Sequence, residues 1–385
     1  MNVFFAVTAP GLETLAAQEL RYLELLPDVT TGAVAASGGV AFQGDLDALY
    51  RANLYLRTAS RVLVRLGDFN AAAFSELRKK AGRLDWSRYL VPGQAVVIRA
   101  TCKASRLYHA DAVAERVAGA IADSLGQPVI RHKPGNEEEA GSSQGTPQLI
   151  VVQLSHNHCT VSVDASGEML HRRGYRQAVA KAPLRETLAA AMVLAAPWDA
   201  VSPLLDPFCG SGTVAIEAAL LALGMAPGRH RRFAFMDWPG FDEQRWTALL
   251  ADSRVRERTA LVPGGQIMAS DRDAGAVRMA QENAVRAGVA QHIQFTCQAV
   301  SAICPPAARG WVITNPPYGV RVSQNKDLRN LYAQLGNVLR AKCPGWQAAI
   351  LCNDKALLTQ TRLTLDSSCS MLNGGIQVLL ARGSV

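Results

Sequence analysis

Apolar residues recur with two different spacings along the first half of the chain. Alternating or continuous apolar runs predict short strands, and apolar residues three or four positions apart predict helices. The predicted strands cover residues 3–7, 40–42, 61–66, 95–100, 149–154 and 159–163. The predicted helices cover residues 12–20, 45–56, 71–81 and 111–125. Strands and helices mixed in this way predict an α+β region.

The second half repeats one order of elements, a strand followed by a helix. A helix is predicted over residues 184–195, and Pro183 is well placed to open it because proline suits the first helical turn. The predicted strands cover residues 204–206, 266–270, 293–297, 311–314, 348–352 and 377–381. Helices fall between most of these strands, so the order predicts βαβ units and a mostly parallel sheet.

A basic connector over residues 170–176 joins the two halves, and we place the domain boundary near residues 165–180. Residues 133–148 combine glycine, proline, serine and a run of glutamates, which predicts an exposed hairpin or loop. The predicted fold class is α/β, with a Rossmann-like sheet after the α+β region. We expect residues 166–385 to fold without the first half.

Composition narrows the class of protein. A chain of 385 residues holds two or three domains of about 100–200 residues each. Hydrophobic residues make up 49% and charged residues 19%, which excludes a disordered chain. The formal net charge of +8 is compatible with a nucleic-acid partner, and equally with a generic basic protein.

The eight cysteines are scattered, and none forms a CxxC pair. His156 and His158 lack a cysteine pair nearby, so we expect no zinc site and no other metal. A chain this large, with a real core, also needs no disulfide scaffold. The N-terminus lacks the features of a signal peptide, and no apolar run reaches the length of a membrane span. We therefore expect a cytoplasmic protein without membrane contact.

A glycine-rich turn follows the first strand of the second half. Residues 204–213 read Leu-Leu-Asp-Pro-Phe-Cys-Gly-Ser-Gly-Thr, and such a turn lets a ligand approach the backbone closely. The lysine of a phosphate loop is missing after Gly212, which disfavours an NTPase. Ala215 takes the third position of the dinucleotide fingerprint, which tolerates alanine, but the Asp-Pro-Phe lead-in is unusual there. By itself, the turn predicts a nucleoside-like ligand only weakly.

Asp271 ends the next strand. A carboxylate at that point is placed to accept hydrogen bonds from ribose hydroxyls. The alternative is that Asp271 only caps the helix that begins near Ala274. The glycine-rich turn upstream favours the ribose role.

The sharpest signal is Asn315-Pro316-Pro317-Tyr318, after an apolar strand. The exocyclic amino group of a base is a poor nucleophile because its lone pair is delocalised into the ring. The Asn315 side-chain oxygen and the Pro316 carbonyl can accept from that group and direct its lone pair at a methyl donor. Two prolines stiffen the turn, and Tyr318 offers a stacking face for an extruded base. The alternative, an ordinary turn, is disfavoured by the strand and the glycine-rich turn nearby.

These residues resemble a known family. Residues 206–213 look like the cofactor motif of class I S-adenosylmethionine-dependent methyltransferases, and 315–318 like their amino-methylating motif. The chain as a whole resembles THUMP-domain RNA guanine-N2 methyltransferases, such as bacterial 23S rRNA enzymes. The stretches that carry this likeness are residues 10–20, 53–59, 105–109, 173–176, 182–189, 226–238 and 372–375.

The resemblance implies three domains: a ferredoxin-like subdomain over residues 1–43, a THUMP RNA-binding domain over 44–165 and a class I methyltransferase domain over 166–385. It also implies S-adenosyl-L-methionine as cofactor. The implied catalytic residues are Asn315, Pro316, Pro317 and Tyr318. The implied cofactor-binding residues are Asp206, Pro207, Phe208, Cys209, Gly210, Ser211, Gly212, Thr213, Asp271, Gln298, Ala299 and Asn315. Gln298 departs from the family, which usually has an aspartate facing the adenine. Cys209 is expected to be a packing residue, because methylating an amine needs no covalent adduct.

The implied partner is RNA, with large-subunit rRNA as the best substrate and tRNA as the close alternative. The side chains that could contact phosphate are Arg57, Arg61, Arg78, Lys79, Lys80, Lys103, Arg106, Arg229, Arg231 and Arg232. DNA adenine-N6 and glutamine methyltransferases share the Asn-Pro-Pro-Tyr motif, but the THUMP-like first half argues against both. A binding module with a dead site is a further alternative, against which both intact motifs argue. The nucleotide position and the number of methyl groups stay open, and a monomer is slightly favoured.

Overall fold

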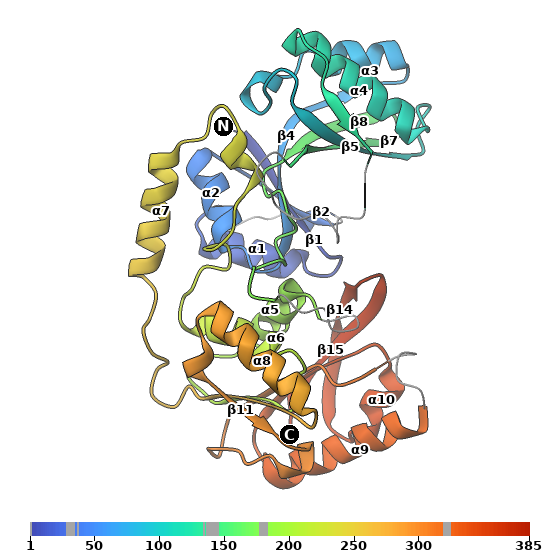
Figure 1. The fold of residues 1–385 in the computed structure, drawn as a ribbon. Helices are drawn as coiled ribbons and strands as arrows, with labels where there is room; N and C mark the ends of the chain where they lie inside the picture. Colours follow the sequence, from blue (N-terminus) through green and yellow to red (C-terminus); the bar gives the residue numbers. More distant parts are fainter. Residues whose placement is uncertain are drawn as a thin grey trace. The chain divides into compact units, whose positions relative to one another are not determined.

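The structure, a computed structural model, describes residues 2–27, 35–36, 38–133, 135, 146–176, 184–318 and 325–385. Pro183 and most of the expected loop at 133–148 lie outside the described residues. The chain forms two compact units (Figure 1). Unit 1 comprises Met1–Val7, Ala17–Leu170 and Arg231–Leu250. Unit 2 comprises Thr8–Ala16, His171–His230 and Ala251–Val385.

Unit 1 is built on an eight-stranded sheet with the order β2-β3-β1-β4-β8-β7-β5-β6. Its strands are β1 Asn2–Thr8, β2 Ala35–Ala36, β3 Gly39–Gly44, β4 Ala59–Asn70, β5 Ala95–Lys103, β6 Ile130–His132, β7 Gln148–Ser155 and β8 His158–Asp164. The helices of this part of the chain are α1 Glu13–Tyr22, α2 Leu46–Tyr55, α3 Phe74–Ala81, η1 Trp86–Arg88 and α4 Ala110–Leu125. The short strands β2 and β6 were not predicted from the sequence.

Local sequence explains these helices. Asp45 caps α2, because its side chain accepts a hydrogen bond from the Ala48 amide at 3.1 Å. Helix α4 buries Val113, Val117 and Ile121, which are the apolar stripe seen in the sequence, and it ends at Gly126 in the left-handed conformation. The predicted helical periodicity is therefore the face that packs on the sheet.

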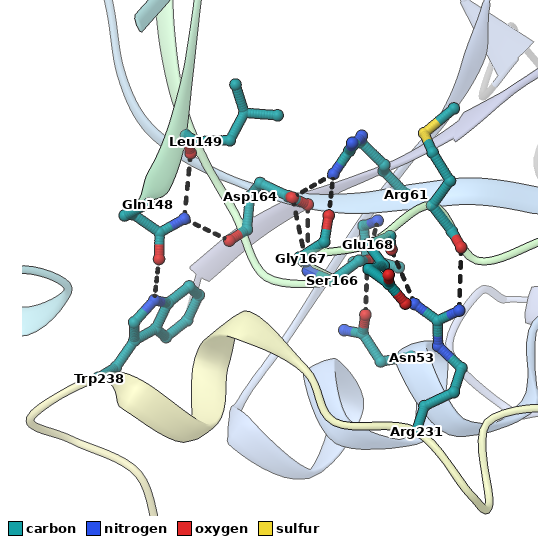
Figure 2. Close-up of polar contacts among 12 residues, drawn as sticks. Asn53, Arg61, Gln148, Leu149, Asp164, Ser166, Gly167, Glu168, Arg231 and Trp238 are labelled. Atoms are coloured by element: carbon teal, nitrogen blue, oxygen red, sulfur yellow. Dashed lines mark hydrogen bonds and ion pairs between the residues drawn. The ribbon is translucent and has the colours of Figure 1, made fainter. Parts of the chain in front are cut away.

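A segment from the second half of the sequence, Arg231–Leu250, belongs to unit 1. Polar contacts fasten its beginning (Figure 2). The Arg231 guanidinium donates to the carbonyls of Met169 at 2.9 Å and Glu168 at 2.7 Å. The Trp238 indole donates to Gln148 Oε1 at 2.8 Å, and Gln148 in turn donates to the Asp164 carbonyl at 2.7 Å.

Aromatic rings hold the same segment against α2. Tyr50 of α2 lies 4.7 Å from the ring of Phe235 and 5.8 Å from that of Trp246, centroid to centroid. Phe233 stacks on Phe235 at 5.2 Å. Phe233 and Phe235 are almost fully buried, so the segment is an integral part of the core of unit 1.

Unit 2 is built on a seven-stranded sheet with the order β11-β10-β9-β12-β13-β15-β14. Its strands are β9 Leu204–Asp206, β10 Ile267–Asp271, β11 Ile293–Cys297, β12 Trp311–Thr314, β13 Gln347–Cys352, β14 Thr364–Asn373 and β15 Ile376–Ser384. The helices in the second half of the chain are α5 Glu186–Ala195, α6 Thr213–Ala222, η2 Ala234–Asp237, α7 Glu243–Val255, α8 Ala274–Ala287, η3 Ala290–His292, η4 Val300–Ala302, α9 Asn325–Lys342 and α10 Lys355–Gln360.

Strands β9 to β13 are parallel, and β15 runs antiparallel to β13. Two cores cover the two faces of this sheet. Helices α5, α6 and α8 contribute to one core, together with Leu204 and Ile313. Helices α9 and α10 contribute to the other, with Leu205 and Val312. The chain thus confirms the predicted Rossmann-like α/β sheet, closed by an antiparallel hairpin.

The strand order reverses between β9 and β12, which are neighbours in the sheet and pair in parallel. Leu204 of β9 is level with Ile267 of β10 and Trp311 of β12. In open α/β sheets, ligands bind outside the carboxyl ends of the strands at such a reversal. Within the described part of the chain, no helix is long and apolar enough to cross a bilayer.

Candidate active site

The predicted site residues of unit 2 follow the carboxyl ends of β9, β10, β11 and β12. Asp206 ends β9 and is buried, with 1% of its surface exposed. Its Oδ1 accepts a hydrogen bond from the Thr314 hydroxyl at 2.6 Å and from the Phe208 amide at 3.2 Å. Because Thr314 directly precedes Asn315, this contact joins the glycine-rich turn to the Asn-Pro-Pro-Tyr segment.

Burial dominates the electrostatics of Asp206. The pKa of its carboxyl is raised to about 7, mainly by removal from water and to a smaller degree by the nearby Asp271 carboxylate, while the hydrogen bonds from Thr314 and Phe208 oppose the shift. A buried acid with such a pKa, at the switch point of the sheet, is typical of a functional site.

The glycine-rich turn leaves its backbone open to a ligand. Gly210 has φ +50°, and a Cβ at this position would meet nothing within 4 Å. Gly212 has φ +83°, and its Cβ would lie 2.9 Å from the Cβ of Ala280. Glycine is therefore required at 212 by close packing of the turn on α8, and at 210 by the left-handed backbone.

Helix α6 begins directly after this turn, with Gly212 as the N-cap residue and no side-chain capping bond. Amide groups of its first turn are therefore left without a capping side chain. A helix N-terminus in this state favours a negatively charged group, such as a carboxylate. The turn and the helix start together fit the amino-acid end of a nucleoside-linked cofactor.

Asp271 supports the turn from the next strand. Its Oδ2 accepts from the Gly210 amide at 3.1 Å, and its Oδ1 accepts from the Asp273 amide at 3.0 Å. Asp273 is the N-cap of α8, since its side chain accepts from the Gly275 amide at 2.8 Å. The alternative that Asp271 itself caps the helix is therefore wrong.

Gln298 follows the end of β11 and lies beside Asp271. The backbone N–H of Gln298 donates to the backbone carbonyl of Asp271 at 2.9 Å, and the Gln298 side chain is half-buried. The next residue, Ala299, is exposed. The structure brings Gln298 to the same edge as the turn, while its expected contact with an adenine ring stays a prediction.

Asn315 carries an acceptor that has no partner in the described part of the chain. Within the described residues its Oδ1 is buried and makes no hydrogen bond. Pro316 is buried and Tyr318 half-buried, and the Tyr318 hydroxyl accepts a hydrogen bond from Asn373 Nδ2 at 3.2 Å. An unpaired buried acceptor is rare in folded proteins, and it fits a ligand that brings an N–H donor.

Cys209 is 6% exposed and belongs to the core on the α6 side of the sheet. Burial raises the pKa of its thiol, and the neighbouring Asp206 and Asp271 raise it further. A thiol kept neutral in this way is a poor nucleophile, as expected of a packing residue.

Sequence reasoning missed one support of the turn. Asn283 of α8 is fully buried, and its Nδ2 donates to the Ser211 carbonyl at 3.0 Å. Arg286 donates to Asn283 Oδ1 and, at 2.7 Å, to the Tyr175 carbonyl in the basic connector. A polar residue in the middle of an otherwise apolar helix face was the available signal.

Most of the basic side chains expected to face RNA have partners inside their own unit. In unit 1, Arg61 forms a buried ion pair with Asp164, and Arg78 binds both carboxylate oxygens of Asp123 at 2.7 and 2.8 Å. The remaining ion pairs are Lys80 with Glu76, Arg232 with Asp237 and, in unit 2, Arg229 with Glu257.

Arg231 holds the Glu168 and Met169 carbonyls instead of facing solvent. Lys79, Lys103 and Arg106 are exposed. These three stay the better candidates for phosphate contacts. Among the described residues, no group of three or more histidine, cysteine or acidic side chains could hold a metal ion.

A reversed-order parallel sheet with a glycine-rich turn, and an unpaired amide acceptor one strand away, defines an α/β enzyme that binds a nucleoside-like cofactor. Comparison with known families makes this specific. Residues 173–381 match the RMKL-like methyltransferase domain, and residues 3–63 match the RlmL ferredoxin-like domain. The chain belongs to this RMKL-like methyltransferase family, as the resemblance predicted.

Individual relatives support this family assignment. The "Putative RNA methyltransferase slr0064" of Synechocystis sp. is 36% identical over 384 residues, which cover 98% of this chain and 96% of the relative. The ribosomal RNA large subunit methyltransferase K/L of Syntrophotalea carbinolica is 35% identical over 387 residues. That alignment covers 98% of this chain and 53% of the relative, so the chain spans about half the length of the K/L protein.

Among solved structures, the chain is similar to SMU.472, "a putative methyltransferase complexed with SAH". The TM-score is 0.85 at 29% identity, and the alignment covers 100% of this chain and 98% of that one. The match extends over the whole chain, and it supports the observed fold of each unit.

Proposed function

We propose that this chain transfers a methyl group from S-adenosyl-L-methionine to the exocyclic N2 amino group of a guanine in structured RNA. Large-subunit rRNA is the best substrate, because the K/L relatives are named for it. The observation that carries the amine chemistry is the buried Asn315 Oδ1, which lacks a partner among the described residues and is joined through Thr314 to the glycine-rich turn.

The residues that hold the cofactor are those of the turn and the strand ends beside it. Residues 206–213 and the start of α6 suit its methionine part, Asp271 suits its ribose, and the region of Gln298 suits its adenine. When bound, S-adenosyl-L-methionine supplies an electrophilic methyl group on a sulfonium. The SMU.472 structure, which holds SAH, supports this cofactor.

The acceptor amine is oriented by this chain's own oxygens. Asn315 Oδ1 and the Pro316 carbonyl accept its two N–H bonds, and this directs the nitrogen lone pair toward the methyl group. The N–C bond forms as the C–S bond breaks, and the amine proton leaves to water. Tyr318, steadied by Asn373, stacks on the extruded base. Acceleration comes from positioning, so no protein base is required beside the amine.

The deciding experiment is nucleoside mass spectrometry of rRNA and tRNA from cells that lack this gene. Loss of N2-methylguanosine from the large-subunit rRNA fraction, restored by the wild-type gene, is the expected result. Loss from tRNA instead would reassign the RNA. Unchanged N2-methylguanosine in both fractions, with N6-methyladenine lost from DNA, would overturn the proposal. Cell fractionation tests the accompanying expectation of a cytoplasmic enzyme.

A further inference from the structure

Two buried side-chain amide oxygens lack hydrogen-bond partners within the described residues, and both belong to unit 2. They are Oδ1 of Asn315 and Oδ1 of Asn353. Asn353 follows the end of β13 directly, as Asn315 follows the end of β12. A buried acceptor that has lost water and gained no donor destabilises the fold, so each unpaired oxygen calls for an explanation.

Asn353 has no role in starting the next helix. The N-cap of α10 is Asp354, whose side chain accepts from the Ala356 amide at 2.7 Å. Asn353 is half-buried, so it is not a freely solvated surface side chain either. Neither a cap nor solvent therefore accounts for its unpaired oxygen.

The sheet register places the two asparagines close together. Strands β12 and β13 are neighbours and parallel, with Thr314 level with Ile350. Asn315 is therefore level with Leu351, and Asn353 lies two positions further along the adjacent strand. With strands about 4.8 Å apart and a rise of about 3.3 Å per residue, this diagonal places their Cα atoms about 8 Å apart.

Both side chains also fall on the same face by strand alternation. Ile313 and Leu351 pack in the core under α5, α6 and α8. Val312, Ile350 and Cys352 pack in the opposite core. One further step of the period-two pattern puts Asn315 after Ile313, and Asn353 after Leu351, on the first face.

The packing behind β13 relates Asn353 to Tyr318, the last residue of the Asn-Pro-Pro-Tyr motif. Tyr332 of α9 is fully buried, and its hydroxyl donates to Cys352 Sγ at 3.2 Å. Tyr318 packs against both cores, including the one that contains Tyr332 and Cys352. Cys352, the residue before Asn353, therefore lies in the same apolar cluster that packs against the ring of Tyr318.

We propose that Asn353 is a specificity-determining residue, whose amide oxygen accepts a hydrogen bond from N1–H of the target guanine. This inference rests on the proposed function. The Watson–Crick edge of guanine presents N1–H next to the N2 amine, so an acceptor beside Asn315 meets a second donor. Adenine and 2-aminopurine have an unprotonated N1. In these bases, N1 and the Asn353 oxygen would both be acceptors, so no hydrogen bond could form between them. A site built to accept a hydrogen bond discriminates strongly against a base that lacks the donor.

The test uses synthetic RNA segments that carry guanine or 2-aminopurine at the methylated position. Both bases carry the C2 amine, so both can be methylated, but only guanine has N1–H. The full-length wild-type chain is expected to favour guanine in kcat/KM. Asn353→Leu should lower kcat/KM for guanine about ten- to hundredfold and leave 2-aminopurine nearly unchanged, so that the preference collapses.

Two variants make the result decisive. Asn353→Asp keeps an acceptor oxygen and should retain most of the preference, while Asn337→Leu changes an exposed asparagine of α9 and should change nothing. Equal losses on both bases, or an unchanged preference in Asn353→Leu, overturn the proposal. If Asn353→Leu misfolds and no longer binds cofactor, Asn353→Asp becomes the deciding variant. Loss of the preference for guanine over 2-aminopurine in Asn353→Asp would then overturn the proposal. Wild-type transfer to adenine N6 instead would reject the proposed function itself, whatever the variants do.

Discussion

At the scale of single residues, the most informative atom is Asn315 Oδ1, because its isolation has a direct consequence for catalysis. We predict that Asn315→Ala lowers kcat by about 10²–10³-fold, the size of effect seen when one positioned hydrogen-bonding group of a catalytic site is removed. Affinity for S-adenosyl-L-methionine should stay within about twofold, since Asp206 and the glycine-rich turn are untouched. Single-turnover methylation and calorimetric titration measure the two quantities.

Asn373 offers a matched comparison for that variant. Its Nδ2 donates to the Tyr318 hydroxyl at 3.2 Å, so Asn373→Ala disturbs the stacking residue without removing the amine acceptor. It should raise KM for RNA more than it lowers kcat. Normal turnover by Asn315→Ala would contradict the role of Asn315 in holding the amine.

We predict that Asp206 makes cofactor binding depend on pH. Burial raises the pKa of its carboxyl to about 7, so the ionised fraction in the free protein grows as pH rises through 7. The ionised form is the one that attracts a positively charged ligand. Affinity for S-adenosyl-L-methionine should therefore increase from pH 6 to pH 8, with proton release on binding near pH 7. Calorimetry in buffers of different ionisation enthalpy measures that release, and Asp206→Asn should abolish it.

The same raised pKa predicts that the stability of the free protein decreases as pH rises. Since the pKa of Asp206 is higher in the folded state than in the unfolded chain, folding favours the protonated carboxyl. This contribution is fully present below the unfolded pKa and is lost as pH rises toward 7. Cofactor should narrow the difference in stability between pH 6 and pH 8. An affinity that stays level over this range would show that Asp206 does not act on the cofactor.

Motif residues were accessible from the sequence because their signals are local. The spacing of Gly210 and Gly212 after a strand, and the Asn-Pro-Pro-Tyr run after another, need no knowledge of distant neighbours. The contacts of Asn283 and the unpaired oxygen of Asn353 could not be predicted in this way. Each depends on a carbonyl, a strand register or a missing partner that exists only once the sheet has formed.

At the scale of elements, helix α8 connects the cofactor turn to the basic connector. Asn283 donates to the Ser211 carbonyl at 3.0 Å, and Arg286 links Asn283 to the Tyr175 carbonyl. Because a Cβ on Gly212 would lie only 2.9 Å from the Cβ of Ala280, the turn also passes close to α8, and this helix restricts the position of the turn. It is a positioning element for the site.

We predict that Asn283→Ala weakens binding of S-adenosyl-L-methionine about tenfold, because the Ser211 carbonyl loses its buried donor. At saturating cofactor, kcat should fall by no more than about twofold. The variant should therefore raise the KM for S-adenosyl-L-methionine with little change in kcat. Gln281→Ala, on the exposed side of the same helix, is the control for helix stability. Equal changes in the two variants, or a loss confined to kcat, would argue against positioning by Asn283.

Element prediction succeeded where apolar periodicity was strong and failed where it was weak. The parallel strands β9 to β13 were placed within one or two residues, because most of them are nearly continuous apolar runs and β11 alternates between apolar and polar residues. Strand β14 was not predicted, since Thr364–Asn373 is rich in serine and only partly buried. The local signal for its pairing with β15 is the two-residue turn Gly374-Gly375, in which both residues have positive φ, and this signal was missed.

At the scale of the whole molecule, the chain passes from one unit to the other more than once. Residues Thr8–Ala16 belong to unit 2, and Arg231–Leu250 belong to unit 1. From the sequence, residues 166–385 are predicted to form one domain, because the alternation of strands and helices continues on both sides of residues 231–250. Partners that lie nearly 200 positions apart, such as Tyr50 and Phe235, leave no periodic signal in either segment.

This interleaving changes what a truncation should do. A fragment of residues 171–385 keeps the described site residues but loses α2, whose Tyr50 packs against Phe235 and Trp246. Phe233 stacks on Phe235 in the same cluster. The fragment also loses Leu12, which is fully buried in the core of unit 2. We predict that the fragment binds a hydrophobic dye and aggregates at micromolar concentration, because these apolar surfaces become exposed.

A matched fragment separates the two causes. Replacing Phe233, Phe235 and Trp246 by serine removes the exposed aromatic surface and leaves the loss of Leu12 unchanged. Dye binding should fall severalfold, and the monomer fraction measured by light scattering should rise, because aromatic side chains carry most of that apolar area. If the unmodified fragment is already monomeric and does not bind dye, then residues 231–250 find another way to bury these rings. Their packing in unit 1 would then be dispensable for a folded catalytic unit.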